Sequence, residues 1–206
     1  MAHSSASEPG AVAQREDHKL APYNPTSEDG IRLALELAGV SSDDTVYDIG
    51  CGDGRTLLAA AAKGARGIGI EYDPKFVERC VLSGTAFGSH CVSLSLSTDA
   101  VPPPPSAKKN IEDAGLASKL SVIEGDAVEL ADLTEATVIF IYLVPKGIDL
   151  LKPRLAKAVR RGARLVSNMF SVPEWTPSRK VATPKGLPVY LYQHPEAPPS
   201  DSTASV

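Results

Sequence analysis

The chain has 206 residues, of which 43% are hydrophobic and 22% charged, and its formal net charge is -4. These proportions are ordinary for a globular protein and exclude wholesale disorder, a collagen-like repeat and a coiled coil. The small negative charge and an aromatic content of 5% also argue against a nucleic-acid partner held by bulk positive charge and stacked side chains.

Residues 1–21 are expected to form a disordered tail, because they contain acidic residues and lack the apolar core of a signal peptide. The longest apolar run, residues 136–144, is too short to cross a bilayer, so no stable membrane insertion is expected. The three cysteines are sparse and lack metal-site spacing, which favours a reducing compartment, taken as the cytoplasm, and no bound metal.

From Thr26 onward, helical and strand patterns alternate. Thr26 or Ser27 can cap a helix that ends at Gly39. The expected strands after it cover residues 45–50, 66–73, 119–127, 136–144 and 163–170. The expected helices between them cover residues 52–64, 74–80, 108–116 and 145–162. Pro153 should break or restart the last of these helices, and two short strands joined by a turn predict a terminal hairpin within residues 178–194.

Residues 81–107 interrupt this alternation, because they are poor in charge and end in a run of four prolines. The segments on either side would join into one amphipathic helix, so residues 81–107 are interpreted as an inserted loop. An intron translated in frame would look similar, and the sequence does not distinguish the two. The expected organisation is therefore one domain over residues 22–194 and a second tail over residues 195–206.

Strands that alternate with helices predict a parallel sheet with helices on both faces. With the terminal hairpin added, the expected fold class is α/β: a doubly wound, Rossmann-like, seven-stranded sheet, mostly parallel with a terminal antiparallel hairpin. Ligands in such sheets bind outside the carboxyl ends of the strands.

An acidic residue followed by three alternate glycines ends the first strand and begins the next helix: Asp48, Gly50, Gly52 and Gly54. A dinucleotide site requires G-x-G-x-x-G. The pattern can be aligned from Gly50 or from Gly52, and its last glycine is then replaced by Arg55 or by Leu57, so neither alignment fits. That spacing disfavours a nicotinamide-dependent oxidoreductase. A tight strand-to-helix turn without a ligand is the plain structural alternative.

The D-x-G-x-G-x-G pattern resembles the signature of class I, seven-β-strand methyltransferases that use S-adenosylmethionine (SAM). Glycines there let the backbone approach the methionine part of the ligand without a Cβ. Glu71 ends the second strand 17 residues after Gly54, where a carboxylate can accept both ribose hydroxyls. The resemblance implies that Asp126 faces the adenine ring, although Asp126 alone is equally well explained as a helix cap. It also implies that Tyr23 and Thr26 close over the ligand, unless Thr26 only caps the first helix.

The expected fourth strand ends in Tyr142-Leu143-Val144-Pro145, at the place where methyltransferases acting on adenine or glutamine commonly have [DN]PP[YF]. The segments APYNPTSED, ATVIFIYLVP and ARLVSNMFSVPEW are similar to a narrower group over about residues 22–193. That group contains the lysine methyltransferase of the ATP synthase c subunit and its prokaryotic relatives. Its mitochondrial members carry a hydrophobic N-terminal segment that is not seen here, so a mitochondrial location is implied by resemblance only.

The resemblance implies a SAM-dependent methyltransferase that acts on a protein lysine, with SAM as cofactor and a protein as partner. The chain is expected to be a monomer. A small-molecule methyltransferase and a non-catalytic SAM-fold binding protein remain alternatives. The acceptor is expected near Tyr142 and Pro145, the candidate catalytic residues. The Leu143 carbonyl could orient an amine, and the Tyr142 ring could face a methylated cation. Strand alternation could equally make Tyr142 a core aromatic, and Trp175 is interpreted as a packing residue.

Overall fold

The computed structural model describes residues 24–77 and 106–193. The helices are α2 (Glu28–Ala38), α3 (Arg55–Ala62), α4 (Pro74–Val77), α5 (Ala107–Asp113), α6 (Ala127–Leu130) and α7 (Pro145–Arg160). The strands are β1 (Thr45–Ile49), β2 (Arg66–Glu71), β3 (Leu120–Glu124), β4 (Val138–Ile141), β5 (Arg164–Asn168), β6 (Arg179–Ala182) and β7 (Pro188–Tyr192). Tyr23 lies outside the described residues, as do residues 81–105 of the expected insertion.

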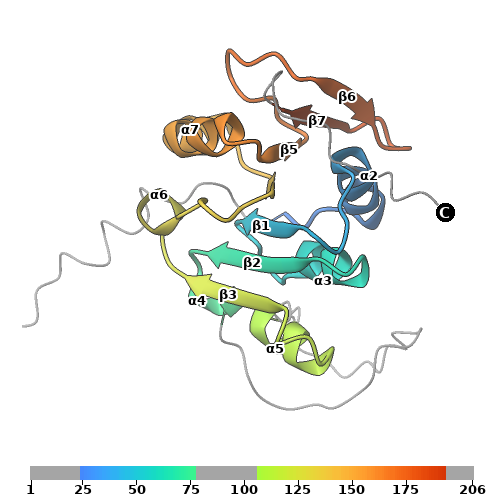
Figure 1. The fold of residues 1–206 in the computed structure, drawn as a ribbon, viewed down its shortest axis with the longest axis vertical. Helices are drawn as coiled ribbons and strands as arrows, with labels where there is room; N and C mark the ends of the chain where they lie inside the picture. Colours follow the sequence, from blue (N-terminus) through green and yellow to red (C-terminus); the bar gives the residue numbers. More distant parts are fainter. Residues whose placement is uncertain (1–23, 78–105, 194–206) are drawn as a thin grey trace, which may run out of the picture.

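The seven strands form one sheet in the order β3-β2-β1-β4-β5-β7-β6 (Figure 1). Strands β3, β2, β1, β4 and β5 pair in parallel, and β7 pairs antiparallel with both β5 and β6. The strand order reverses between β1 and β4, because the chain crosses after β3 from one edge of the sheet to the other side of β1. The expected α/β fold with a terminal antiparallel hairpin is confirmed.

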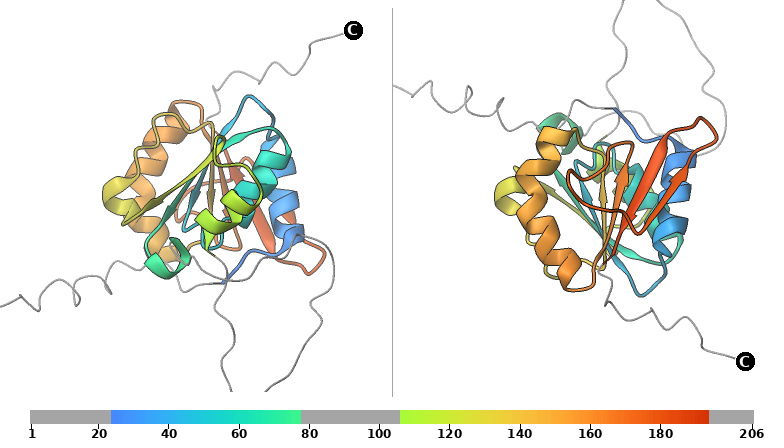
Figure 2. Two further views of the ribbon diagram at one scale, coloured as in Figure 1. Left: turned by 90° about the horizontal axis from the view of Figure 1, so that it is seen from below. Right: turned by 90° about the horizontal axis from the view of Figure 1, so that it is seen from above.

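Helices cover both faces of the sheet (Figure 2). Helices α6 and α7 lie on one side, where Ile148, Leu151 and Leu155 of α7 are fully buried with the strand residues Ile139 and Leu165. Helices α2, α3 and α5 lie on the other side and pack against the opposite side chains of the same strands. The central strands β1 and β4 are buried along their whole length, as expected of parallel strands covered on both faces.

Ser27 is the N-cap of α2, because its Oγ accepts a hydrogen bond from the backbone N–H of Gly30 at 3.2 Å. Gly39 ends the helix in the left-handed conformation, with φ 63°. Of the two capping candidates, the structure selects Ser27. Thr26 is buried and faces the carboxyl end of the sheet instead.

The prediction that Pro153 interrupts its helix was wrong. Helix α7 runs without a break from Pro145 to Arg160 with Pro153 inside it. Pro153 is exposed, whereas Leu151 and Leu155 on either side of it are fully buried. We infer that burial of these two leucines on the sheet outweighs the backbone hydrogen bond that proline lacks.

Most elements are shorter than the expected ranges by a few residues at one or both ends, and two of these boundaries bear on the site and the insertion. Strand β4 ends at Ile141, so the three residues that follow leave the sheet before α7 begins. Helix α5 begins at Ala107, capped by the Ser106 Oγ, which accepts from the N–H of Lys109 at 3.4 Å. Ser106 and Ala107 were assigned to the insertion because proline and serine dominate the stretch before them.

Trp175 packs on the core, as predicted. Its ring meets that of Tyr192 edge-on at 5.9 Å, and the Tyr192 hydroxyl accepts a hydrogen bond from the N–H of Val172 at 2.8 Å. The segment between β5 and β6 therefore closes the α7 side of the sheet. Within residues 24–77 and 106–193, no helix is both long and apolar enough to cross a membrane.

Candidate active site

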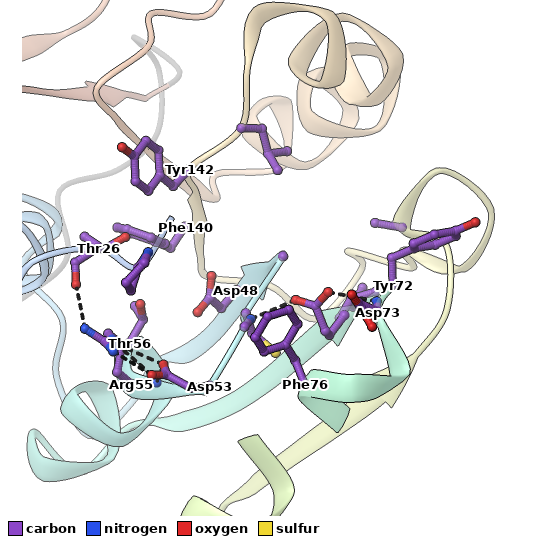
Figure 3. Close-up of a pocket in the computed structure, with 18 of the residues that line it drawn as sticks. Thr26, Asp48, Asp53, Arg55, Thr56, Tyr72, Asp73, Phe76, Phe140 and Tyr142 are labelled. Atoms are coloured by element: carbon purple, nitrogen blue, oxygen red, sulfur yellow. Dashed lines mark hydrogen bonds and ion pairs between the residues drawn. The ribbon is translucent and has the colours of Figure 1, made fainter. Parts of the chain in front are cut away.

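A cleft of about 870 Å³, counted with its open mouth, lies at the carboxyl ends of β1, β2, β3 and β4 (Figure 3). This is the edge of the sheet where the strand order reverses, and where parallel α/β sheets bind ligands. The predicted site residues that line it are Thr26, Asp48, Gly50, Gly52, Glu71, Asp126 and Tyr142. The structure thus brings together residues separated by more than 100 positions in the sequence.

The glycine loop forms the floor of this cleft. Gly50, Gly52 and Gly54 have φ of 78°, 54° and 77°, which other residues adopt at a cost. Gly50 donates its N–H to the carbonyl of Ile70 at 2.8 Å, and this bond fixes the loop to β2. Gly54 does not line the cleft; a Cβ there would meet the Ala107 Cβ at 3.0 Å. Its role is to let α3 approach α5 closely.

The Glu71 carboxylate is buried at the end of β2 and held by backbone donors. Oε2 accepts from the N–H of Gly52 at 2.8 Å, and Oε1 accepts from the N–H of Asp73 at 2.9 Å. Burial raises the pKa of Glu71, while these hydrogen bonds act in the opposite direction. The carboxylate is therefore oriented before any ligand arrives.

Asp48 is the second-last residue of β1 and is the most deeply buried acid among the described residues of the cleft, with 3% of its surface exposed. Burial raises its pKa to about 8, opposed by a hydrogen bond with Thr56 and reinforced by the nearby charges of Glu71 and Asp53. Asp48 is therefore mostly protonated at neutral pH, and a cation bound in this cleft would favour its ionised form.

Asp126 was interpreted from the sequence either as a helix cap or as a residue of the ligand site, and the structure is compatible with both. Its Oδ1 accepts from the N–H of Val128 at 2.7 Å and caps α6, and the same residue lines the cleft. The cap fixes the side chain but does not exclude contact with a ligand.

Tyr142 stands at the mouth of the cleft, one residue beyond β4, above Phe140 (Figure 3). It is half-buried, and its ring also packs partly on the α2 side of the core. Its hydroxyl accepts from Asn24 Nδ2 at 2.8 Å and donates to Met169 Sδ at 3.2 Å. Pro145 is exposed, begins α7 and is absent from the residues that line the cleft. Its catalytic assignment stays a prediction.

Comparison with known proteins places this cleft in context. A protein-lysine N-methyltransferase from Saccharolobus islandicus is 32% identical over 176 residues, which cover 83% of this chain and 92% of that protein. The chain belongs to this family of SAM-dependent methyltransferases. A family model described as the ANTKMT methyltransferase domain matches residues 79–179. A second, described as methionine biosynthesis protein MetW, matches residues 32–98.

A solved structure described as an RNA methyltransferase from Salinibacter ruber, in complex with S-adenosyl-L-homocysteine, resembles this methyltransferase closely. It is 35% identical, with a TM-score of 0.67, and the alignment covers 86% of this chain and 98% of that one. A ribosomal protein L11 methyltransferase from Clostridium botulinum is 25% identical over 130 residues, which are 32% of its length. The cofactor of this methyltransferase is SAM, as the sequence predicted.

Sequence analysis missed several residues that line the methyltransferase's cleft: Asn24, Asp53, Thr56, Tyr72, Asp73 and Phe76. Arg55 was noticed only because it breaks the dinucleotide pattern. Its guanidinium binds both oxygens of Asp53, at 2.9 and 2.6 Å, and donates to the Thr26 carbonyl at 3.3 Å. Arg55 thus fixes the segment before α2 to the start of α3. Asn24 stands within the quoted segment APYNPTSED and Tyr72 within the expected strand 66–73, but a single polar or aromatic residue there carries no distinct signal.

Proposed function

We propose that this methyltransferase transfers a methyl group from SAM to the side-chain amine of a lysine in a protein partner. The observation that carries the proposal is the relative from Saccharolobus islandicus, named a protein-lysine N-methyltransferase and matched over 92% of its length. The description of the Salinibacter ruber structure makes RNA the competing acceptor.

The charges of the cleft favour a cationic acceptor over RNA. Among the described residues, its lining carries five acidic side chains, Asp48, Asp53, Glu71, Asp73 and Asp126, of which Asp48, with a pKa of about 8, is mostly protonated at neutral pH. Arg55 is the one lysine or arginine among the lining residues within 24–77 and 106–193, and its guanidinium is paired with Asp53. Such a surface repels a phosphate backbone and attracts a protonated lysine on approach.

The cleft fits SAM. Gly50 and Gly52 put backbone without Cβ atoms at its floor, where the methionine part would lie. The Glu71 carboxylate accepts backbone hydrogen bonds from Gly52, Asp73 and Tyr72, and of its about four lone-pair sites one is left that could accept a ribose hydroxyl. We assign cofactor binding to Thr26, Asp48, Gly50, Gly52, Gly54, Glu71 and Asp126, with Gly54 acting through the loop. Tyr23, proposed from the resemblance, lies outside the described residues.

When bound, SAM supplies a methyl group already activated by its sulfonium charge. The protein must therefore present a neutral, aligned amine and exclude water, and it needs little acid–base chemistry. Tyr142 at the mouth of the cleft and the Leu143 carbonyl beside it are the groups we propose to orient that amine. Pro145 would contribute by fixing the start of α7 directly after them.

The proposal is tested by incubating the purified full-length protein with methyl-labelled SAM and a lysate from cells that lack it. We expect a labelled protein band that survives ribonuclease and disappears with protease. Mass spectrometry of that band should place the methyl group on lysine. Label on RNA, on arginine or glutamine, or only on small molecules would overturn the lysine assignment. Fractionation and size-exclusion chromatography of the same protein test the accompanying proposals of a cytoplasmic location and a monomer.

A further inference from the structure

Tyr142 is the centre of a short hydrogen-bond chain at the mouth of the cleft. Asn24 Nδ2 donates to the Tyr142 hydroxyl at 2.8 Å, and that hydroxyl donates to Met169 Sδ at 3.2 Å. The three residues come from the segment before α2, the end of β4 and the end of β5. No role in cofactor binding has been given to Asn24 or Met169.

The turn that presents Met169 is fixed in an unfavourable backbone conformation. Met169 has φ 68°, which is uncommon for a residue with a bulky side chain. Its N–H donates to the Pro188 carbonyl at 2.8 Å, and the N–H of Phe170 donates to the Asn168 carbonyl at 2.8 Å. Ser167 Oγ donates to the Phe170 carbonyl at 2.5 Å. Such strain persists where the surroundings impose it, and it concentrates at functional sites.

The hydrogen bonds to Asn24 and Met169 determine which further hydrogen bond the Tyr142 hydroxyl can form. A phenolic hydroxyl has one proton to donate and lone pairs with which to accept. Its proton is directed at the Met169 sulfur, and one lone pair accepts from Asn24. The capacity that remains is that of an acceptor, which suits an N–H or O–H donor and not a carboxylate or a carbonyl oxygen.

We propose that Asn24 and Met169 hold the Tyr142 hydroxyl as a hydrogen-bond acceptor for an N–H of the incoming amine. This inference rests on the proposed lysine function and adds a selection step to it. An amine that donates one N–H to Tyr142 keeps its nitrogen lone pair free to point into the cleft. A substrate group that has no proton to donate would face only the lone pair of the Tyr142 oxygen and could form no hydrogen bond with it. Asn24 and Met169 are thus positioning residues for the substrate amine.

A double-mutant cycle tests this arrangement in the full-length enzyme, with the lysine protein identified from the lysate as acceptor. Tyr142→Phe and Met169→Leu should each lower kcat/KM about fivefold, as expected for one neutral hydrogen bond. Met169→Leu should have no further effect in the Tyr142→Phe background, because the hydroxyl it orients is gone. The Kd for SAM should stay within twofold. Additive losses would overturn the proposal.

Glu174 provides the matched control for Met169. It is the other described residue besides glycine with positive φ, at 65°, and it is bound to Lys152 at 2.6 Å. Glu174→Leu places a leucine in the same kind of backbone conformation away from Tyr142, and it also removes the exposed ion pair with Lys152. It should leave kcat/KM unchanged in both backgrounds. A loss equal to that of Met169→Leu would show that the effect is merely structural.

A second measurement needs neither SAM nor activity. The sequence contains two methionines, Met1 and Met169, so methyl-labelled methionine gives two NMR signals that are easily assigned. Tyr142→Phe and Asn24→Ala should shift the Met169 methyl signal and leave that of Met1 in place. If Tyr142→Phe leaves the Met169 methyl signal unshifted, the proposed hydrogen bond between Tyr142 and Met169 is wrong. If the wild-type enzyme labels no lysine, the proposed function fails; if it labels lysine but the cycle is additive, only this inference fails.

Discussion

Glu71 Oε2 accepts a hydrogen bond from the backbone N–H of Gly52 at 2.8 Å. The carboxylate proposed to hold the ribose therefore also holds the glycine loop proposed to receive the methionine part of SAM. Its other oxygen fixes the start of the next turn through the N–H of Asp73. The two sequence motifs, read separately along the chain, form one preorganised unit in the structure.

Glu71→Ala should weaken SAM binding by about 2–3 kcal/mol, the scale of charge-assisted hydrogen bonds. Its effect on the free energy of unfolding should be smaller, within about 1 kcal/mol, because burial raises the pKa of Glu71 and its removal relieves that cost. Calorimetry and denaturant unfolding measure the two quantities. Glu124→Ala is the matched control, since Glu124 pairs with Glu71 in the register of β2 and β3 and is exposed. Equal affinities for the two variants would show that Glu71 only orders the loop.

Gly52→Val should abolish detectable SAM binding in a protein that still folds. Gly52 has φ 54°, and a branched side chain there would be strained and would project from the backbone that lines the cleft. Gly186→Val is the control, because Gly186 has φ 79° and a Cβ there would meet nothing within 4 Å. Both variants should lose stability, by about 1–2 kcal/mol, while Gly186→Val keeps its affinity for SAM. Normal binding by Gly52→Val would remove the loop from the cofactor site.

The fold was predictable because its signals are local and repeated. Buried parallel strands read as apolar runs, and glycines mark the turns between them. The same reasoning failed at Pro153, where the deciding factor is burial of Leu151 and Leu155 on a sheet distant in sequence. Propensity is a local quantity, and tertiary packing overrode it here.

The candidate site was predictable where a residue type carries a backbone or charge requirement, as at Gly50 and Glu71. It was not predictable where the role depends on a partner far along the chain. Asn24 meets Tyr142 across 118 positions and Met169 meets it across 27. No pattern in one sequence marks such a pair, since neither residue has unusual neighbours.

Residues at the amino ends of the parallel strands, opposite the cleft, should affect the free energy of unfolding but not the affinity for SAM. Arg164 forms an ion pair with buried Asp44 and donates to the Ala38 carbonyl at 2.5 Å. Asp44 also accepts from Thr137 Oγ1 at 2.7 Å and from the N–H of Ser41 at 2.8 Å. Arg164→Met should lower the free energy of unfolding by about 3 kcal/mol, because it leaves a buried carboxylate without its cation.

Denaturant unfolding measures that loss, and calorimetry should show an unchanged Kd for SAM. Arg32→Met is the control, because Arg32 makes only exposed ion pairs, with Asp29 and Glu36, worth little. A change in SAM affinity in Arg164→Met alone would show that the two ends of the sheet are coupled.

The ligand-free enzyme should become less stable as the pH rises from about 5 to 8, and Asp48 is the main cause, with a smaller contribution of the same sign from Glu71, whose pKa burial also raises. The pKa of Asp48 is about 8 in the folded protein, against 3.8 ordinarily, because of burial. Between those values the folded state keeps a proton that the unfolded state has released, so the free energy of unfolding falls with pH. Above pH 8 both states are ionised and this contribution is constant. Asp48→Asn, which cannot ionise, should flatten the curve and be more stable than wild type at pH 8.

Thermal melts of both proteins across this pH range test the prediction, with Asp43→Asn as the control. Asp43 lies before the same strand but is exposed, so its substitution should leave the slope unchanged. If the melting temperatures of Asp48→Asn and wild type change equally with pH, burial does not hold the proton on Asp48. If the slope flattens and SAM affinity also falls, one carboxylate lowers the stability of the ligand-free fold and binds the cationic cofactor. That outcome would explain why an acid stands at a position where the core would be more stable without it.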